Sequence, residues 1–282
     1  MARARTTIAH HYDLGNDFYR ALLGPTMAYS CGYWRDDGPG TTLDSAQLAK
    51  LDLVCRKLAL RQGDTLLDVG CGWGSLLLYA AEHYGVRATG VTLSAQQYEY
   101  VRSQVVDRRL EHLVEVRLEH YRDIKGSFAA VASIEMGEHV GNDNYASYCE
   151  AMRSVLRPGG RLLLQQMSRS RSAPGGGPFI ESYIARDMVM RPLHRTLEYL
   201  EAAGFEVRTV DCLREDYIRT IDAWAGRLET DRDEIHYRFG SRRARIWRLY
   251  LAGASLAFEA NRMSVHQVVA KVGDRHAEGP SG

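Results

Sequence analysis

Short apolar blocks alternate with longer amphipathic blocks along residues 65–166 of this chain. The apolar blocks predict buried strands at 65–69, 86–91, 113–117, 128–134 and 161–166. Helical spacing separates them, and the last helix, Tyr145 to Leu156, is followed by Arg157-Pro158-Gly159-Gly160, which is typical of a helix stop. This alternation predicts an α/β fold with a doubly wound, Rossmann-like and mostly parallel sheet.

The flanking segments predict further elements. Helices are expected before the alternation at 14–23 and 43–60, and after it at 193–203, 216–228 and 233–259. Strands at 207–210 and 265–272 bring the expected sheet to seven strands. The polar, glycine-rich connection at 168–178 is too long for an ordinary loop, so it indicates the start of a lid. We expect the polar tail at 273–282 to be disordered.

Composition narrows the class of protein. The chain has 282 residues and a net charge of +1, so it has no overall field that would attract nucleic acid, and we expect no nucleic-acid partner. No apolar run approaches the ~20 residues that span a bilayer, and the N-terminus does not resemble a signal peptide. The five cysteines lack paired or zinc-type spacing, which favours reduced thiols in a cytoplasm and no metal site.

A glycine-rich turn follows the strand at 65–69. Gly70, Gly72 and Gly74 stand at alternate positions just before a helical block, and Asp68 precedes the first of them by two residues. Glycines at such a turn let a ligand approach backbone N–H groups at a helix N-terminus. The spacing G-x-G-x-G is not the G-x-G-x-x-G of dinucleotide folds. It resembles the S-adenosylmethionine (SAM) loop of class I methyltransferases.

Several longer motifs extend this resemblance to a narrower family. They are His10-His11-Tyr12-Asp13-Leu14-Gly15-Asn16-Asp17-Phe18-Tyr19, Tyr29-Ser30-Cys31-Gly32-Tyr33-Trp34, Gly90-Val91-Thr92-Leu93-Ser94, Glu135-Met136-Gly137-Glu138-His139-Val140-Gly141 and Tyr217-Ile218-Arg219-Thr220. With them the chain resembles the cyclopropane-fatty-acid synthase family, which includes the mycolic acid cyclopropane synthases, over residues 8–272. The resemblance implies one methyltransferase domain at 1–272, with a helical cover at 1–60, a SAM-binding core at 61–167, a lid and helical lipid-binding part at 168–260 and a last strand at 261–272.

The resemblance also implies the residues that bind SAM. The turn holds its methionine end and Asp68 fixes the turn, while the N-terminal segment closes over the cofactor. The implied set is Tyr29, Ser30, Asp68, Gly70, Cys71, Gly72, Thr92, Leu93, Ser94, Gln97, Tyr121 and Arg122. Most class I enzymes bind the ribose hydroxyls with an acidic residue after the second strand. Here Val91-Thr92 stands there, so Gln97 is the expected substitute, unless it is a surface residue near a helix cap.

Glu138 is the residue we expect to carry the chemistry. It follows a buried strand, at the edge of the sheet where α/β folds bind ligands, although a carboxylate at a helix N-terminus is the alternative. The resemblance implies that Glu138, Cys31 and Tyr217 surround a bound bicarbonate that acts as the base. Taken alone, Cys31 is an ordinary buried thiol and Tyr217 a packing residue. The family usually adds a His where this chain has Gln165, and a Gln cannot titrate near neutral pH.

The resulting hypothesis is SAM-dependent transfer of a methyl or methylene group to the double bond of an unsaturated acyl chain, most directly in a phospholipid. The product is a cyclopropane or a methyl- or methylene-branched chain. A natural-product C-methyltransferase and a non-catalytic SAM- or lipid-binding protein are the alternatives. The arginine-rich segment 238–248 predicts peripheral contact with the inner membrane face, or else a solvated helix. A homodimer is compatible with these expectations.

Overall fold

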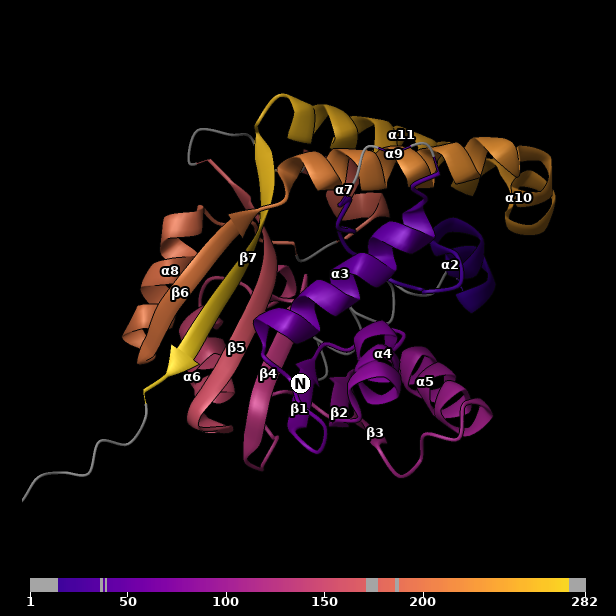
Figure 1. Cartoon of the computed structure of the whole chain (residues 1–282). Helices are drawn as coiled ribbons and strands as arrows, with labels where there is room; N and C mark the ends of the chain where they lie inside the picture. Colours follow the sequence, from indigo (N-terminus) through magenta and orange to yellow (C-terminus); the bar gives the residue numbers. More distant parts are fainter. Residues whose placement is uncertain (1–14, 36–37, 39, 171–176, 186–187, 274–282) are drawn as a thin grey trace, which may run out of the picture.

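A seven-stranded sheet organises the chain, in the order β3-β2-β1-β4-β5-β7-β6 (Figure 1). The structure is a computed structural model that describes residues 15–35, 38, 40–170, 177–185 and 188–273. The strands are β1 (Thr65–Val69), β2 (Arg87–Thr92), β3 (Val114–Leu118), β4 (Phe128–Ile134), β5 (Leu156–Arg169), β6 (Phe205–Cys212) and β7 (Met263–Val272). β7 alone runs in the direction opposite to the other six strands, so the predicted doubly wound, mostly parallel sheet is confirmed.

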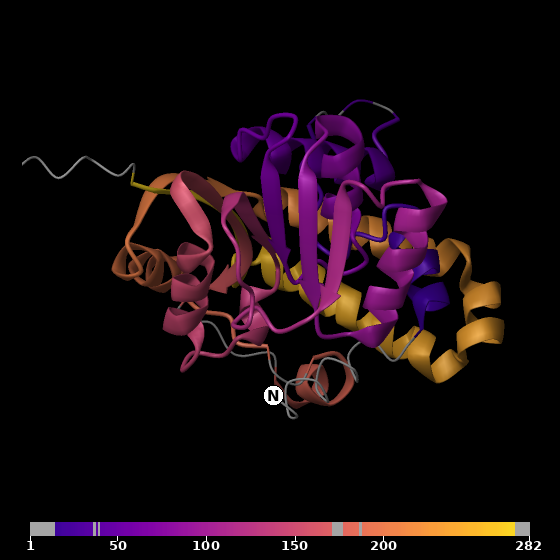
Figure 2. The same cartoon turned by 90° about the horizontal axis from the view of Figure 1, so that it is seen from below.

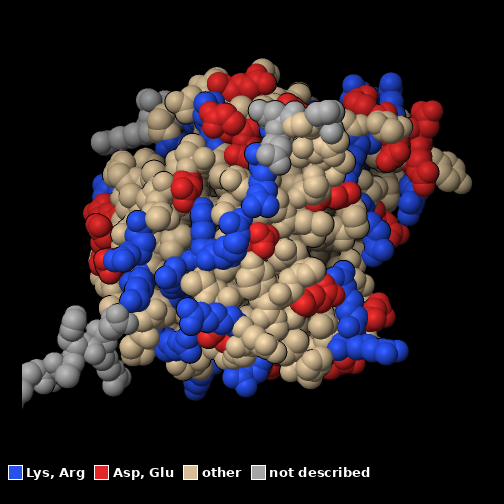
Figure 3. All heavy atoms as spheres, in the orientation of Figure 1, with Lys and Arg blue, Asp and Glu red and all other residues tan. Residues whose placement is uncertain are grey.

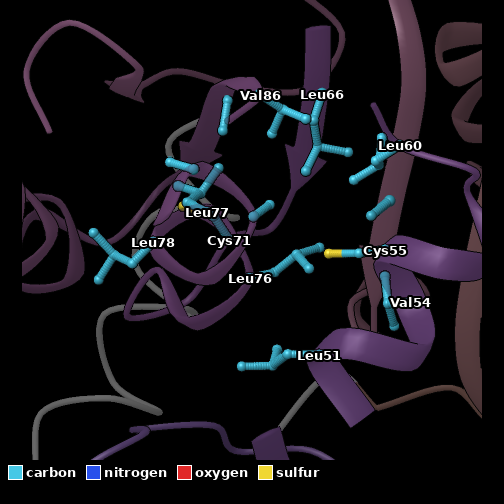
Figure 4. Packing of buried hydrophobic residues seen from close by; sticks show 14 of the residues in the cluster. Leu51, Val54, Cys55, Leu60, Leu66, Cys71, Leu76, Leu77, Leu78 and Val86 are labelled. Carbon is cyan, nitrogen blue, oxygen red and sulfur yellow. The ribbon is translucent and has the colours of Figure 1, made fainter. Parts of the chain in front are cut away.

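Helices cover both faces of the sheet, as Figure 2 shows. On one face α3 (Leu43–Lys57), α4 (Ser75–Tyr84) and α5 (Ala95–Asp107) pack apolar side chains on β1 and β2, in the cluster drawn in Figure 4. On the other face lie α6 (Tyr145–Ser154) and α8 (Leu193–Ala202). Burial of these apolar faces, at ~25 cal/mol per Å², drives the layers together.

A third cluster lies beyond the carboxyl ends of the strands. It joins α2 (Asn16–Leu23) to α9 (Arg214–Thr230), α10 (Arg232–Phe239) and α11 (Ser241–Glu259), and α9 and α11 lie across the top of the sheet in Figure 1. Aromatic rings dominate it; the Phe18 and Trp247 ring centroids, for example, are 5.2 Å apart. The N-terminal helix α2 and the C-terminal helices are far apart in sequence, yet they pack together into one layer over the strand ends.

Several expected boundaries are corrected. The expected helix 233–259 is two helices, because Gly240 interrupts it with φ 88° and ψ 142°. The strand expected at 161–166 already begins at Leu156, which pairs with Phe128, so the preceding helix ends at Ser154. The Pro-Gly-Gly stop therefore lies inside β5, at a register shift where Gly159 has φ 73°. Strands 65–69 and 128–134 are confirmed as predicted.

The expected lid is described in part. α7 (Gly177–Tyr183) has no buried residue, and Tyr183 is half exposed. Beyond α7, the Val189 N–H donates to the Glu138 carbonyl at 2.8 Å, which ties this segment to the short 3₁₀ helix η1 (Gly137–His139). The His10–Asp13 motif and the 273–282 tail, apart from Gly273, lie outside the described residues. The division of the domain into cover, core and lid stays a prediction.

Candidate active site

A cavity of about 410 Å³ opens where β1, β2 and β4 end. In the order β2-β1-β4 the chain leaves β1 toward one side and β4 toward the other, which is the switch point where open α/β sheets bind ligands. Residues just after each strand line it: Gly70 after β1, Leu93 after β2 and Glu135 after β4. The strand order therefore brings the predicted cofactor residues to one place.

The glycine turn is shaped by close backbone approach. Gly70 has φ 80°, and a Cβ there would lie 2.5 Å from Cγ of Met136. Gly72 has φ 55°, and a Cβ there would meet no protein atom within 4 Å; Gly72 also lines the cavity. The N–H groups of Gly70 and Cys71 both donate to the Val91 carbonyl, so these two amides hold the turn to β2. In Figure 4 the Cys71 side chain lies against Leu77. Cys71 also lines the cavity, and its burial raises the pKa of the thiol.

The second strand presents an oriented amide. The Thr92 hydroxyl accepts from the Ser94 N–H at 3.1 Å, so its own proton goes to Oε1 of Gln97 at 2.8 Å. Nε2 of Gln97 is then buried without a protein partner, although Gln97 lines the cavity. An orphaned buried donor costs roughly 1–3 kcal/mol, which a ribose hydroxyl would relieve. Ser94 itself is not among the described lining residues, because its side chain caps α5.

Tyr121 and Arg122 line the far end of the cavity. The Arg122 guanidinium lies 5.6 Å from the Tyr121 ring centroid and donates to Oδ1 of Asn144 at 2.7 Å. Asn144 lines the cavity as well, and an aromatic ring beside a fixed guanidinium forms a flat wall that suits an adenine.

A buried lysine, Lys50, lines the same cavity and interacts electrostatically with the predicted Asp68. Nζ of Lys50 donates to Oγ of Ser30 at 2.9 Å, while Gln47, one turn earlier on α3, donates to the Ser30 carbonyl at 2.8 Å. α3 thereby holds the segment that brings Tyr29 and Ser30 to the cavity. Burial lowers the pKa of Lys50 to about 8 and raises the pKa of Asp68 to about 7. No motif or spacing in the chain singled out Lys50 beforehand.

The centre of the predicted catalytic cluster is Glu135, a residue that we did not predict. Its Oε1 accepts from the Cys31 N–H and from Nε2 of Gln165, each at 2.8 Å. Its Oε2 accepts from the Tyr217 hydroxyl at 2.7 Å. Burial raises the pKa of Glu135, and these three donors oppose the rise. Glu135 also has φ 50°, a left-handed conformation that costs a non-glycine residue about 1–2 kcal/mol.

Glu138 stands apart from this cluster. It is fully buried and is not among the described residues that line the cavity. Its Oε1 accepts from the Met167 N–H at 2.6 Å, and its Oε2 is buried with no protein partner. Burial, together with the nearby Glu135, raises the pKa of Glu138 to about 8. Cys31, Gln165 and Tyr217 therefore meet as expected, but around Glu135 rather than Glu138.

The donor set does not fit a bound bicarbonate. The Cys31 amide, the Gln165 amide and the Tyr217 hydroxyl would have to hold the anion, and all three already donate to Glu135. The Cys31 thiol points elsewhere, at 3.1 Å from the Gly32 carbonyl. A second anion beside a buried carboxylate would also be repelled. We therefore derive no step through bicarbonate.

The arginine-rich segment lies on α10 and α11, with its largest apolar side chains turned inward. Trp247 is buried, and the Phe239 ring lies 5.3 Å from the Phe18 ring. Arg238 pairs with Asp17 and Arg248 with Glu229. In Figure 3 acidic and basic side chains mix at this end, whereas basic side chains gather over β5, β6 and β7. Peripheral membrane contact stays a prediction, and no helix of the described residues is long and apolar enough to cross a membrane.

Residues 1–268 match the family model described as "Mycolic acid cyclopropane synthetase". The chain belongs to this family of SAM-dependent methyltransferases. A probable fatty acid methyltransferase of Pseudomonas putida is 38% identical over 93% of the chain and 68% of its own length. The cyclopropane-fatty-acyl-phospholipid synthase of Escherichia coli K12 is 36% identical over 92% of the chain and 66% of its own length. The chain thus spans about two thirds of these relatives.

A solved structure gives the same result for the fold. The mycolic acid cyclopropane synthase CmaA1, in complex with SAH and CTAB, is 30% identical with a TM-score of 0.89 and covers 95% of this chain and 98% of its own. The predicted family and fold are confirmed. The prediction that the chain is a SAM-dependent methyltransferase of the cyclopropane fatty acid synthase family is confirmed as well. The roles of individual site residues stay predictions.

Proposed function

We propose that this chain transfers a methyl or methylene group from SAM to the double bond of an unsaturated acyl chain carried by a phospholipid. The Glu135 carboxylate is the base of this reaction. The observation that carries the proposal is the set of three donors on Glu135, which itself lines the cavity in which we place SAM. The names of the two relatives, a fatty acid methyltransferase and a fatty-acyl-phospholipid synthase, support an acyl substrate.

The chemistry explains why a buried base is needed. SAM supplies an electrophilic methyl group, which the π electrons of the alkene take up as the C–S bond breaks and its electron pair stays on sulfur. A carbocation is left on the neighbouring carbon, and water must be kept from it. Aromatic side chains above the strand ends meet that need, since Tyr29 lines the cavity and its ring lies 5.4 Å from that of Trp224. Aromatic faces also stabilise a cation by ~0.5–2 kcal/mol each.

Glu135 completes the reaction by removing one proton. When the proton leaves the added methyl group, the C–H electron pair either closes a three-membered ring or forms a methylene double bond after a hydride shift. A methyl branch requires a later reduction of the methylene double bond, in which a separate hydride donor supplies a hydride and the solvent supplies a proton. The Cys31 amide, Gln165 and Tyr217 oppose the rise in the pKa of Glu135 that its burial causes. Oε1 accepts two hydrogen bonds, whereas Oε2 accepts only one, from Tyr217, and so retains a lone pair for the proton.

The test uses phospholipid vesicles with monounsaturated chains and SAM carrying a fully deuterated methyl group. We expect mass spectrometry to find one added carbon per modified chain, with two of the three deuterium atoms retained. Glu135→Gln should lower turnover by about 10²–10⁴-fold, the usual contribution of a positioned base. Derivatisation of double bonds then separates a ring from a methylene branch.

The matched variant is Glu138→Gln, which removes the other buried carboxylate after β4. Its turnover should fall much less than that of Glu135→Gln. An unchanged turnover in Glu135→Gln would overturn the assignment of the base. Lipids that gain no carbon while the protein binds SAH would overturn the substrate class and favour a small-molecule acceptor.

A further inference from the structure

A row of polar side chains leads from Glu135 through the sheet to the protein surface. Gln165 of β5 lies directly opposite Gln267 of β7, and Gln267 lies opposite Asp211 of β6. Both glutamines are fully buried. Nε2 of Gln267 donates to Oε1 of Gln165 at 2.8 Å, and Nζ of Lys57, the last residue of α3, donates to Oε1 of Gln267 at 2.7 Å. Burying polar amides is costly unless they are hydrogen-bonded, so a continuous row of them inside the sheet indicates a role.

The ammonium group fixes the direction of every hydrogen bond in this row. Lys57 only donates, so the Gln267 oxygen faces it and the Gln267 nitrogen faces inward. Gln165 must then accept with its oxygen, which leaves its nitrogen to donate to Glu135 at 2.8 Å. Reversal of either amide would place two oxygens or two N–H groups against each other inside the sheet. Such a mismatch in a buried network costs roughly 1–3 kcal/mol.

We propose that Lys57, through Gln267 and Gln165, is a positioning residue that holds the Glu135 carboxylate in its ionised, reaction-ready orientation. This inference rests on the proposed role of Glu135 as the base. Amide groups do not pass protons along such a row, so the row transmits orientation and the field of aligned dipoles. At the position where the family is expected to have a His, Gln165 supplies the hydrogen-bond donor. The positive charge is on Lys57, at the other end of the row.

Burial raises the pKa of Glu135, and the hydrogen bond from Gln165 is one of the interactions that lower it again. Further ionisable groups face Glu135 from the surrounding elements. They are Cys31, Lys50 of α3, Glu138 of η1, Tyr217 of α9 and Tyr250 of α11. Among the described hydrogen bonds, none of these groups contacts Lys57 or Gln267, and the Cys31 carbonyl accepts a long bond from Gln165, at 3.4 Å.

The decisive variant is Gln267→Glu. A carboxylate at this position still accepts from Lys57 but has no proton for Gln165, so the Gln165 amide must turn and direct its oxygen at Glu135. We expect the acid limb of the pH profile of methyl transfer, with SAM saturating, to move up by at least about one pH unit, or tenfold at a fixed acidic pH. Lys57→Met should move it in the same direction by less, and Lys57→Arg should restore the wild-type profile.

Asp211→Asn is the matched control. Asp211 is the other partner of Lys57, at 2.8 Å, and its side chain is 47% exposed, so this variant removes a surface ion pair while leaving the Lys57–Gln267 bond. Exposed pairs of this kind contribute little. Its pH profile should match that of the wild type. A Gln267→Glu profile that also matches the wild type, in folded protein, would overturn the proposal.

A second readout separates this inference from the proposed function. Infrared difference titration of each variant, with and without Glu135→Gln in addition, follows the Glu135 carboxyl band directly and needs no substrate. A band that titrates at higher pH in Gln267→Glu and Lys57→Met supports the positioning role, even if no lipid is methylated. A band that titrates identically in all variants overturns it, even if lipid methylation is found.

Discussion

The two sides of the cavity are built in different ways. The side formed by β1 and β2 takes its shape from backbone: Gly70 and Gly72 at positive φ, and an amide, Gln97, oriented by its neighbour Thr92. The side formed by β4 and β5 takes its shape from buried groups that donate hydrogen bonds to Glu135. Two of these donors belong to Cys31 and Tyr217, which are 104 and 82 positions away in the sequence. A local motif thus prepares the cofactor side, whereas tertiary packing assembles the side where the proton is removed.

Removal of the Glu135 side chain should have the largest effect. Glu135→Gly suits the left-handed backbone, with φ 50°, which offsets part of the cost of leaving three buried donors without an acceptor, so urea unfolding should show a loss of stability. Methyl transfer should fall by about 10²–10⁴-fold. The variant also leaves the Cys31 amide, Gln165 and the Tyr217 hydroxyl without their acceptor. We therefore expect added formate or bicarbonate to restore part of the activity.

The control for this rescue is Tyr217→Phe combined with Glu135→Gly, which removes one of the donors. The double variant should respond more weakly to either anion. Rescue of the same size in both variants would mean that the anion acts elsewhere, and absence of any loss in Glu135→Gly would remove Glu135 from the mechanism.

The difference between the two sides also explains what could be predicted from the sequence. The glycine turn and the strand ends are local, so strands 65–69 and 128–134 and most cofactor residues follow from short segments. Glu135 and Glu138 both follow β4, and only packing shows which of them meets Gln165. The absence of the expected His could have pointed to Glu135. Because the Gln in its place cannot titrate, another side chain must supply the ionisable group.

On the backbone-built side, Gly72→Ala should weaken SAH binding strongly. Gly72 lines the cavity and a Cβ there meets no protein atom within 4 Å, so we expect its methyl group to compete with the ligand. We expect a loss of about 100-fold in affinity by isothermal titration calorimetry, equivalent to about 2.7 kcal/mol. Stability should fall by only about 1–2 kcal/mol from the left-handed backbone.

Gly63→Ala provides the same backbone penalty away from the cavity, with φ 84° and no atom within 4 Å. It should lose a similar amount of stability and keep its affinity for SAH. Equal affinities in the two alanine variants would show that the glycine turn does not contact the ligand.

Gln97→Met tests the single oriented donor on the same side. Loss of the hydrogen bond from Nε2 should weaken SAH binding about tenfold, equivalent to about 1.4 kcal/mol. Gln104→Met, a substitution at a partly exposed position on the same helix that does not line the cavity, should have no effect on affinity. If both variants bind SAH as the wild type does, the buried Gln97 amide serves the fold alone.

The smallest effect concerns stability and its dependence on pH at Glu138. Burial raises the folded-state pKa of Glu138 to about 8, above its ordinary value of 4.5. The folded protein therefore holds a proton that the unfolded chain releases, so this contribution to stability is complete below about pH 4.5 and is lost as the pH rises toward about 8. Asp68 and Glu135 have raised pKa values too, and their contributions have the same sign.

Glu138→Gln removes one member of this set, because an amide does not titrate. We would measure urea unfolding of both proteins at several pH values between about 5 and 9. As the pH rises, the unfolding free energy of the variant should increase relative to that of the wild type, by on the order of a few kcal/mol in total. A difference that stays constant with pH would mean that Glu138 is ionised in the folded protein. It would then be a second buried carboxylate beside Glu135, and the assignment of a single base after β4 would no longer hold.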